Sequence, residues 1–291
     1  MSALVPRLFV LLQRALPKHL LTSLVYRLAR IRIVAVKNFL IRRFVGWYAV
    51  DLDELQHPVP DGFVTFNDFF IRELAPGSRI IDATEASIVS PVDGTVSAAG
   101  RIDRNLLFQA KGLSYTLTDL LATDTADAEK YVGGAFATIY LAPYNYHRVH
   151  APQAGELLHA RYVPGDLFSV NDATVQNLPW LFARNERLVC HITTRGGPMV
   201  LIFVGAMNVG TINTIWTGDI RPRSSGVVET IDIRKNQVAA AFDKGDTLGW
   251  FNMGSTVIML SPPGGSDNFA NLEAGQTVRT GQAIGRHASI E

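Results

Sequence analysis

A Gly254-Ser255-Thr256 step between two apolar runs near the C-terminus contains the residue types in this chain that most directly suggest chemistry. Glycine permits a positive φ or a strained backbone, and the hydroxyl of the next residue can attack the preceding carbonyl and convert a peptide into an ester. Three small residues after a strand also form ordinary turns. The step therefore predicts either self-cleavage between Gly254 and Ser255 or a plain turn.

Three further side chains could assist the Ser255 hydroxyl. Asp93 lies in a Pro-Val-Asp-Gly turn, and His147 precedes His150 by three residues. An acid, a histidine and a serine can act as orienting group, base and nucleophile, which is how enzymes activate a hydroxyl. The alternatives are a turn aspartate and ordinary surface histidines. The histidines lack a third ligand at a suitable spacing, so no metal site is expected.

The segments that must position these side chains are mostly short strands. From residue 88 onward, β-branched segments alternate with glycine and proline, which predicts an antiparallel sandwich or barrel. Residues 66–74 predict a short helix with Asn67 or Asp68 near its N-cap. An α/β-hydrolase is disfavoured, because it would carry Gly-x-Ser-x-Gly in an alternating α/β pattern.

The first fifty residues differ from the rest in charge. They hold nine Lys and Arg and no Asp or Glu, with leucines at helical spacing. This pattern is typical of amphipathic helices at an anionic lipid interface, and the alternative is a helical layer packed on the core. Charges interrupt the apolar pattern too often for a transmembrane span. No nucleic-acid motif accompanies the basic charge, so no nucleic-acid partner is expected.

Composition and length bound the architecture. The 291 residues are 47% hydrophobic, enough for a substantial core, and the single Cys190 excludes an intrachain disulfide and a cysteine zinc cluster. We expect an α+β fold, with N-terminal amphipathic helices followed by a mainly antiparallel core like a β-sandwich or barrel-sandwich hybrid. Residues 1–60 form the expected basic membrane-docking region, and residues 61–291 form the expected β-rich catalytic domain.

The chain resembles the phosphatidylserine decarboxylases of the bacterial and mitochondrial type, which are pyruvoyl-dependent and are made as proenzymes. The matching segments occur in order along the chain: residues 66–74, 90–94, 144–150, 163–171, 204–210 and 254–256. The family usually has leucine or glycine before Gly-Ser-Thr, whereas this chain has Met253. Methionine nearly conserves the volume of leucine, so we expect processing to be retained.

The resemblance implies self-cleavage between Gly254 and Ser255 into a long chain 1–254 and a short chain 255–291, which stay associated. Ser255 would become a covalent pyruvoyl group, and no pyridoxal phosphate or metal is implied. Asp93 and His150 match the acid and base of processing. His147 matches a residue beside the pyruvoyl group that assists decarboxylation.

The resemblance also implies the reaction and the substrate. Phosphatidylserine in an anionic membrane would form a Schiff base with the pyruvoyl group, lose CO₂ and give phosphatidylethanolamine. Residues 164–171 would line the pocket, with Ser169 as a head-group contact. We expect a peripheral protein on the cytoplasmic face of the inner membrane.

Two other functions remain open from the sequence. One is a non-catalytic membrane-binding β-sandwich module in which the Gly254-Ser255 step stays intact. The other is a pyruvoyl decarboxylase that acts on a soluble amino acid. The sequence leaves open whether the chain forms a homo-oligomer.

Overall fold

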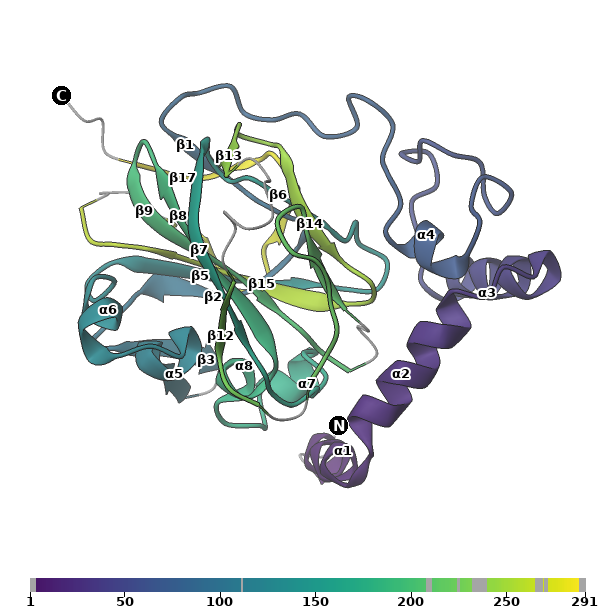
Figure 1. Cartoon of the computed structure of the whole chain (residues 1–291), viewed down its shortest axis with the longest axis horizontal. Coiled ribbons are helices and arrows are strands. Elements are labelled where there is room, and N and C mark those ends of the chain that lie inside the picture. Colours follow the sequence, from purple (N-terminus) through teal and green to yellow (C-terminus); the bar gives the residue numbers. More distant parts are fainter. Residues whose placement is uncertain are drawn as a thin grey trace.

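The chain begins with three helices that lie along one side of a β-rich body (Figure 1). This computed structural model describes residues 4–110, 112–207, 211–223, 226–231, 240–264, 269 and 272–287. The three helices are α1 (Leu4–Ala15), α2 (Lys18–Ala29) and α3 (Val34–Trp47). Helix α1 ends before Pro17, because a proline disfavours helical geometry in the residue that precedes it.

The N-terminal helices leave many apolar side chains in solvent. In α1, Leu8, Leu11 and Leu12 are 64%, 58% and 56% exposed. Exposed apolar side chains continue along α2 and α3 and include Leu20, Leu24, Leu28, Val34, Phe39 and Trp47. None of the described helices combines the length and apolarity that crossing a bilayer requires.

Five shorter helices interrupt the rest of the chain. They are α4 (Phe66–Phe70), α5 (Leu117–Leu121), α6 (Thr125–Glu129), α7 (Asp172–Val175) and α8 (Leu181–Arg184). Helix α4 begins with a capping box, in which the Thr65 side chain accepts from the backbone N–H of Asp68 and the Asp68 side chain accepts from the backbone N–H of Thr65. The N-cap is therefore Thr65, and Asn67 and Asp68 lie close to it in the first turn, as predicted. The helix ends at Phe70, earlier than the predicted residue 74.

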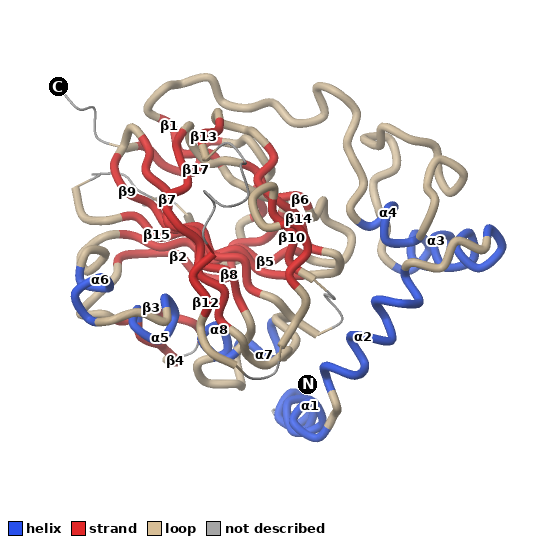
Figure 2. The backbone as a smooth tube through the Cα atoms, viewed as in Figure 1, coloured by secondary structure: helices blue, strands red, loops and turns tan. Residues whose placement is uncertain are grey.

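The largest sheet is antiparallel and has the order β12-β7-β8-β9-β15-β5-β2-β16, with β13 also paired to β7 (Figure 2). Its strands are β2 (Gly94–Arg101), β5 (Ala135–Leu141), β7 (Gly155–Val163), β8 (Arg187–Thr194), β9 (Gly197–Val204), β12 (Glu229–Ile231), β13 (Ala241–Phe242), β15 (Ser255–Ser261) and β16 (Thr277–Val278). Strand β15 pairs with β9 on one side and β5 on the other, and all of its residues are buried.

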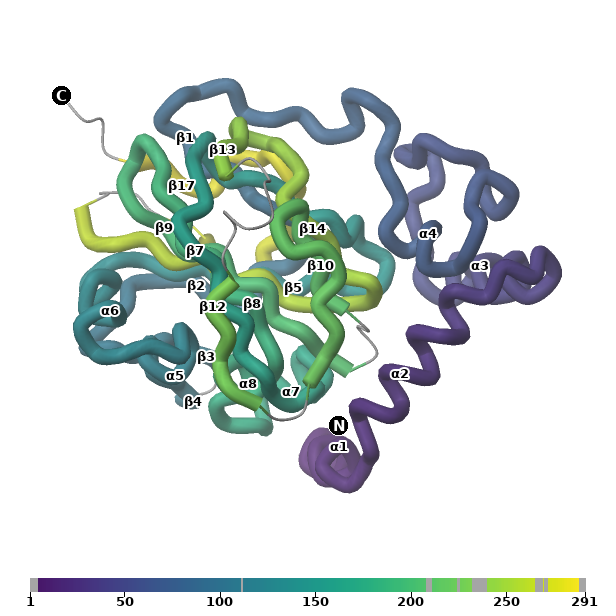
Figure 3. The backbone as a smooth tube through the Cα atoms, in the orientation of Figure 1, coloured from purple at the N-terminus to yellow at the C-terminus, as the bar shows by residue number. Residues whose placement is uncertain are grey.

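Three smaller sheets complete the body. One has the order β11-β10-β14-β6, and the others are the pairs β1-β17 and β3-β4. Their strands are β1 (Ser87–Val89), β3 (Leu106–Ala110), β4 (Leu113–Thr116), β6 (Arg148–His150), β10 (Ile212–Thr214), β11 (Gly218–Ile220), β14 (Thr247–Phe251) and β17 (Ala283–Arg286). The C-terminal strand β17 lies beside β1, which belongs to the first third of the chain (Figure 3).

The core lies between these sheets. Phe203 of β9 contacts Phe251 of β14 with 5.5 Å between ring centroids, and both belong to one large apolar cluster. The expected α+β class with N-terminal helices and a mainly antiparallel core is confirmed. Within the described residues, no sheet closes into a barrel.

A second apolar cluster joins the helices to the segment that follows them. It contains Ala29, Ile41, Phe44, Val50, Phe63, Phe66, Phe69 and Phe70. These residues come from both sides of position 60, and the boundary between residues 1–60 and 61–291 stays a prediction.

Candidate active site

Ser255 is the first residue of β15 and lies within the largest sheet. It pairs with Leu141 of β5, and its side chain is fully buried. Its Oγ atom has no hydrogen-bond partner among the described residues. Because a buried hydroxyl without a partner is costly, this atom requires an explanation beyond packing.

Gly254 does not use the conformational freedom that the sequence offered. It is absent from the glycines with positive φ, and a Cβ atom added there would lie 4.0 Å from the Leu141 carbonyl oxygen. The positive φ that glycine permits is therefore not adopted at this position. In this conformation, the space around Gly254 would accept a methyl group.

A cavity of about 290 Å³ lies next to Gly254. Two loop segments contribute to its wall, one at residues 169–171 and the other at residues 206–207. The remaining lining residues are Phe44, Tyr48, Phe70, Tyr140, Pro143 and Met253. The matching segment 204–210 includes residues 208–210, which lie outside the described residues.

His147 is fully buried against one of these lining residues. Its ring lies 4.2 Å from the Phe70 ring, centroid to centroid. Its Nδ1 lies 2.8 Å from the Asn145 carbonyl oxygen, which can only accept, so Nδ1 carries the proton and Nε2 has the lone pair. Burial, and then the charge of Arg72, lower the pKa of His147 to about 3. His147 is therefore a neutral base whose Nε2 has no partner among the described residues.

His150 ends β6 and has a similar arrangement. Its Nδ1 lies 2.7 Å from the Gly245 carbonyl oxygen, so this nitrogen donates. Its Nε2 lies 2.9 Å from the Tyr146 hydroxyl, which must then donate to it. Burial lowers the pKa of His150 and raises that of Tyr146 to about 12, so both groups are neutral near pH 7.

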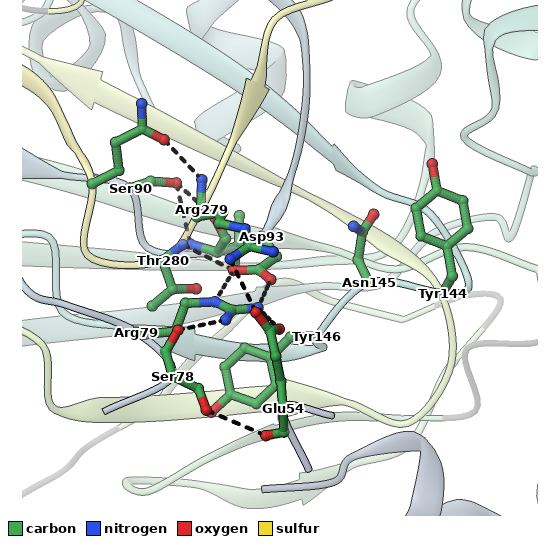
Figure 4. A network of polar contacts seen from close by, with 12 residues as sticks. Glu54, Ser78, Arg79, Ser90, Asp93, Tyr144, Asn145, Tyr146, Arg279 and Thr280 are labelled. Atoms are coloured by element: carbon green, nitrogen blue, oxygen red, sulfur yellow. Dashed lines mark hydrogen bonds and ion pairs between the residues drawn. The ribbon is translucent and has the colours of Figure 1, made fainter. Parts of the chain in front are cut away.

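Asp93 belongs to a network of charged groups rather than to a pair with His150 (Figure 4). Its carboxylate accepts from Arg79 through Nε at 2.9 Å and also forms an ion pair with Arg79 Nη2. It accepts from the backbone N–H of Thr280 at 2.9 Å as well. Arg79 in turn pairs with Glu54 at 2.8 Å, and Arg279 reaches the same Glu54 at 2.9 Å.

Ser169 lies in the cavity wall with Val170 and Asn171, whereas residues 164–168 are not among the residues that line this cavity. Its backbone N–H donates to Gln13 Oε1 of α1 at 2.8 Å. Its hydroxyl accepts a long hydrogen bond from the backbone N–H of Asn171, at 3.4 Å. Its role as a head-group contact stays a prediction.

The structure therefore brings Ser169 and Gly254 to one cavity and joins it to His147 through Phe70. Both His150 nitrogens and the Asp93 oxygens have other partners than one another, so the expected hydrogen bond between Asp93 and His150 is not formed here. The catalytic roles of these residues stay predictions.

Several residues around the site were missed from the sequence. Asp93 binds Arg79 instead of His150, and His150 binds Tyr146 instead of Asp93. Asn252, in the segment before Gly254, accepts a hydrogen bond from Asn67 Nδ2 at 3.0 Å. Tyr146 and Asn67 lay in the matching segments 144–150 and 66–74, and no local pattern signalled the long-range contact of Arg79 with Asp93. Within the described ranges, no three His, Cys, Asp or Glu side chains gather as a metal ion would require.

Comparison with known proteins places the chain in an enzyme family. The model of the family described as Phosphatidylserine decarboxylase matches residues 66–286, and a second, described as PSD, matches residues 8–49. The chain is 46% identical over 284 residues to the phosphatidylserine decarboxylase proenzyme of Alcanivorax borkumensis, covering 97% of each chain. It is 45% identical over 281 residues to that of Marinobacter nauticus, covering 96% of this chain and 98% of the relative. This chain therefore belongs to the phosphatidylserine decarboxylase family.

Proposed function

We propose that this chain is a proenzyme that cuts itself between Gly254 and Ser255 and then decarboxylates phosphatidylserine. The observation that carries the proposal is the Ser255 hydroxyl, which is buried without a partner directly after a glycine that lines the cavity. A nucleophile that must attack its own peptide needs an unengaged oxygen and protection from water. The family membership supports the same conclusion.

Self-cleavage starts with attack of Ser255 Oγ on the Gly254 carbonyl carbon, which replaces the peptide bond by an ester and frees the amine. Loss of the Ser255 α-proton then breaks the Cβ–O bond, so Gly254 leaves as a carboxylate and residue 255 becomes dehydroalanine. Its imine tautomer takes up water and releases ammonia. The products are the chain 1–254 and the chain 255–291, whose first residue is a pyruvoyl group.

The two histidines are suited to move the protons. By the resemblance, His150 takes the proton of Ser255 Oγ and Asp93 stabilises the resulting charge; His147 assists decarboxylation. Both histidines are neutral in this state, with a lone pair on Nε2. If His150 Nε2 gave up its hydrogen bond from the Tyr146 hydroxyl, this nitrogen could accept the proton of Ser255 Oγ.

Many contacts would hold the two chains together after the cut. Strand β15 lies between β5 and β9, β16 pairs with β2, and β17 pairs with β1. In the same network, the backbone N–H of Thr280 donates to Asp93 and Arg279 pairs with Glu54. The break would remove one covalent bond and leave these pairings in place.

The surroundings of the cavity favour a lipid over a free amino acid as substrate. An apolar groove of about 420 Å³ runs along α2 and α3, and Phe44, Tyr48 and Met253 line both the groove and the cavity. A head group in the cavity would thus lie next to space for hydrocarbon. The pyruvoyl carbonyl, once formed, supplies the electron sink that decarboxylation of an amino acid requires.

The N-terminal helices are proposed to dock the enzyme on the anionic cytoplasmic face of the inner membrane. Their exposed leucines can bury apolar area in the interface, and their exposed arginines can attract anionic lipid. Gln13 of α1 accepts from the backbone N–H of Ser169, so the docking helices contact the cavity wall directly.

The first test is the denatured mass of the purified chain and of two serine variants. We expect two chains divided after Gly254, with the 255–291 fragment lighter than its serine form by one ammonia. Ser255→Ala should give one uncut, inactive chain. The control Ser261→Ala, at the other end of β15, should be cut normally.

Cleavage of Ser255→Ala, or decarboxylation by an intact chain, would contradict the mechanism. Assays on phosphatidylserine vesicles and on free serine then decide the substrate. Turnover of free serine alone would rule out the lipid.

A further inference from the structure

Two walls of the cavity beside Gly254 are loop segments that lie outside the β-sheets. One wall is residues 169–171, in the loop after β7, and the other is residues 206–207, in the loop after β9. Strand β8 lies between β7 and β9 and runs antiparallel to both. The residues just before β8 therefore lie between the two walls, and these residues are Asn185 and Glu186.

The side chain of Asn185 forms hydrogen bonds with the residue directly before each wall. Its Oδ1 accepts from the backbone N–H of Phe168 at 3.0 Å, and its Nδ2 donates to the Phe168 carbonyl at 2.8 Å. The same Nδ2 donates to the Gly205 carbonyl at 2.9 Å. Phe168 and Gly205 are each the residue directly before a wall, so this one amide fixes the starting points of both.

The backbone of Glu186 repeats this connection. Its N–H donates to the Asp166 carbonyl and its carbonyl accepts from the Gly205 N–H, both at 2.9 Å. Its carboxyl is buried against the same glycine, where an added Cβ would lie 2.6 Å from Oε1. Tyr162 donates to the other oxygen at 2.8 Å. Gly205 thus cannot move toward β8 without meeting the Glu186 side chain.

We propose that Asn185, supported by Glu186, is a positioning residue that sets the distance between the two cavity walls and so the fit of the substrate head group. This inference rests on the proposed function insofar as the head group occupies this cavity. The amide is chemically specific, because the site needs one acceptor and two donors at once. A carboxylate there would face two carbonyl oxygens.

The test compares Asn185→Asp with Asn177→Asp. Asn177 donates to the Ala173 carbonyl at 2.8 Å and contacts neither wall through its side chain. We measure cleavage after Gly254, kcat and KM for phosphatidylserine in mixed micelles, and inhibition by glycerophosphoethanolamine, a head-group competitor without acyl chains. For Asn185→Asp we expect full cleavage, kcat within about threefold of wild type, and KM and the inhibition constant both raised about tenfold. The control should match wild type.

A residue that only supported folding would reduce the fraction of cut, active enzyme and leave KM unchanged, and that result would overturn the proposal. An unchanged KM with normal cleavage would do the same. If Asn185→Asp fails to fold, Gly205→Ala provides the test, because its added methyl group must push the wall at residues 206–207 away from the Glu186 side chain. It should raise KM and the inhibition constant with kcat preserved, and unchanged constants would refute the inference.

The wild-type enzyme separates this inference from the proposed function. Failure of the wild-type chain to be cut contradicts the proposed function, whatever the variants do. A wild type that is cut and active, beside an Asn185→Asp variant with unaltered KM, contradicts the positioning role alone.

Discussion

At the scale of single residues, both histidines of the site are held as neutral bases by backbone carbonyl oxygens. The Asn145 carbonyl fixes the tautomer of His147, and the Gly245 carbonyl fixes that of His150. In many enzymes an aspartate does this, whereas here Asp93 is engaged by Arg79 and Thr280. The orienting role expected of Asp93 is thus taken by the backbone in this state.

Alanine variants should separate the two histidines. His150→Ala should leave the chain uncut, because Ser255 would lack its base. His147→Ala should still be cut but lose about 100-fold in decarboxylation, the usual value of a proton-transfer group. Gel analysis and CO₂ release measure these outcomes. His159→Ala, on β7 in a stacked pair with His191, is the control and should behave as wild type.

Acidification gives a second test of the histidines. Since burial lowers the pKa of His150, the rate of self-cleavage should stay constant on acidification until the pH falls below the ordinary range of histidine. A decline centred on the ordinary histidine pKa would show that the base is exposed.

Glu186 should make the stability of the enzyme depend on pH. Burial raises its pKa from 4.5 to about 7, so the folded state keeps a proton that the unfolded state has lost between these values. The contribution of Glu186 to the free energy of unfolding therefore falls as pH rises from about 4.5 to 7, by a few kcal/mol in order of magnitude.

Glu186→Gln should remove this dependence. Its Tm relative to wild type should rise between pH 5 and pH 7.5 and then level off. A Tm difference that does not change with pH would contradict the raised pKa. Glu156→Gln, on exposed β7 surface, is the matched control.

At the scale of elements, α4 carries the aromatic side chain that contacts His147. The helix has only five residues, so its capping box is a large part of what holds it. Asn67 also connects it to Asn252, which precedes Gly254 by two residues. The short helix therefore links the N-terminal apolar cluster to His147 and to the segment before Gly254.

Thr65→Ala should lower the free energy of unfolding by about 1 kcal/mol, since it removes an N-cap hydroxyl that accepts from the Asp68 N–H. Urea unfolding measures the change. Thr118→Ala, inside α5 rather than at its cap, should have a smaller effect. Equal losses in both variants would argue against the capping role.

At the scale of the whole molecule, the N-terminal helices lie outside the β-rich body (Figure 1) and carry exposed leucines and arginines. The N-terminal helices contact the cavity wall through Gln13, which accepts from the backbone N–H of Ser169. They contact the β-rich body through Lys18, which pairs with Asp166 at 3.1 Å. The proposed lipid-docking surface and the proposed head-group cavity are thereby parts of one structure.

The double variant Leu8→Ser/Leu12→Ser should bind vesicles containing anionic lipid more weakly by about 30-fold or more, because each leucine loses on the order of 1 to 2 kcal/mol of apolar burial in the interface. Sedimentation with vesicles measures binding. Self-cleavage should be unchanged, since both side chains are exposed.

The control double variant Ile80→Ser/Leu158→Ser removes side chains that are 84% and 53% exposed and lie outside the N-terminal helices. It should bind vesicles as wild type does. Equal losses in both double variants would contradict docking through α1.

The sequence by itself determined the class of fold and the residues of interest. Hydrophobic periodicity and the glycines and prolines between segments are local signals, so the N-terminal helices and the antiparallel strands could be predicted from them. The Gly-Ser-Thr step and the ordered matching segments indicated the family, which the comparisons confirmed.

Only the tertiary structure decided which groups meet. Arg79 reaches Asp93, Tyr146 reaches His150, and Asn185 joins two loops that are far apart in the sequence. The pKa values of His147 and Glu186 also depend on burial, which no local pattern encodes. The physical reason is that hydrogen bonds and desolvation act through space, whereas sequence periodicity reports only on neighbours along the chain.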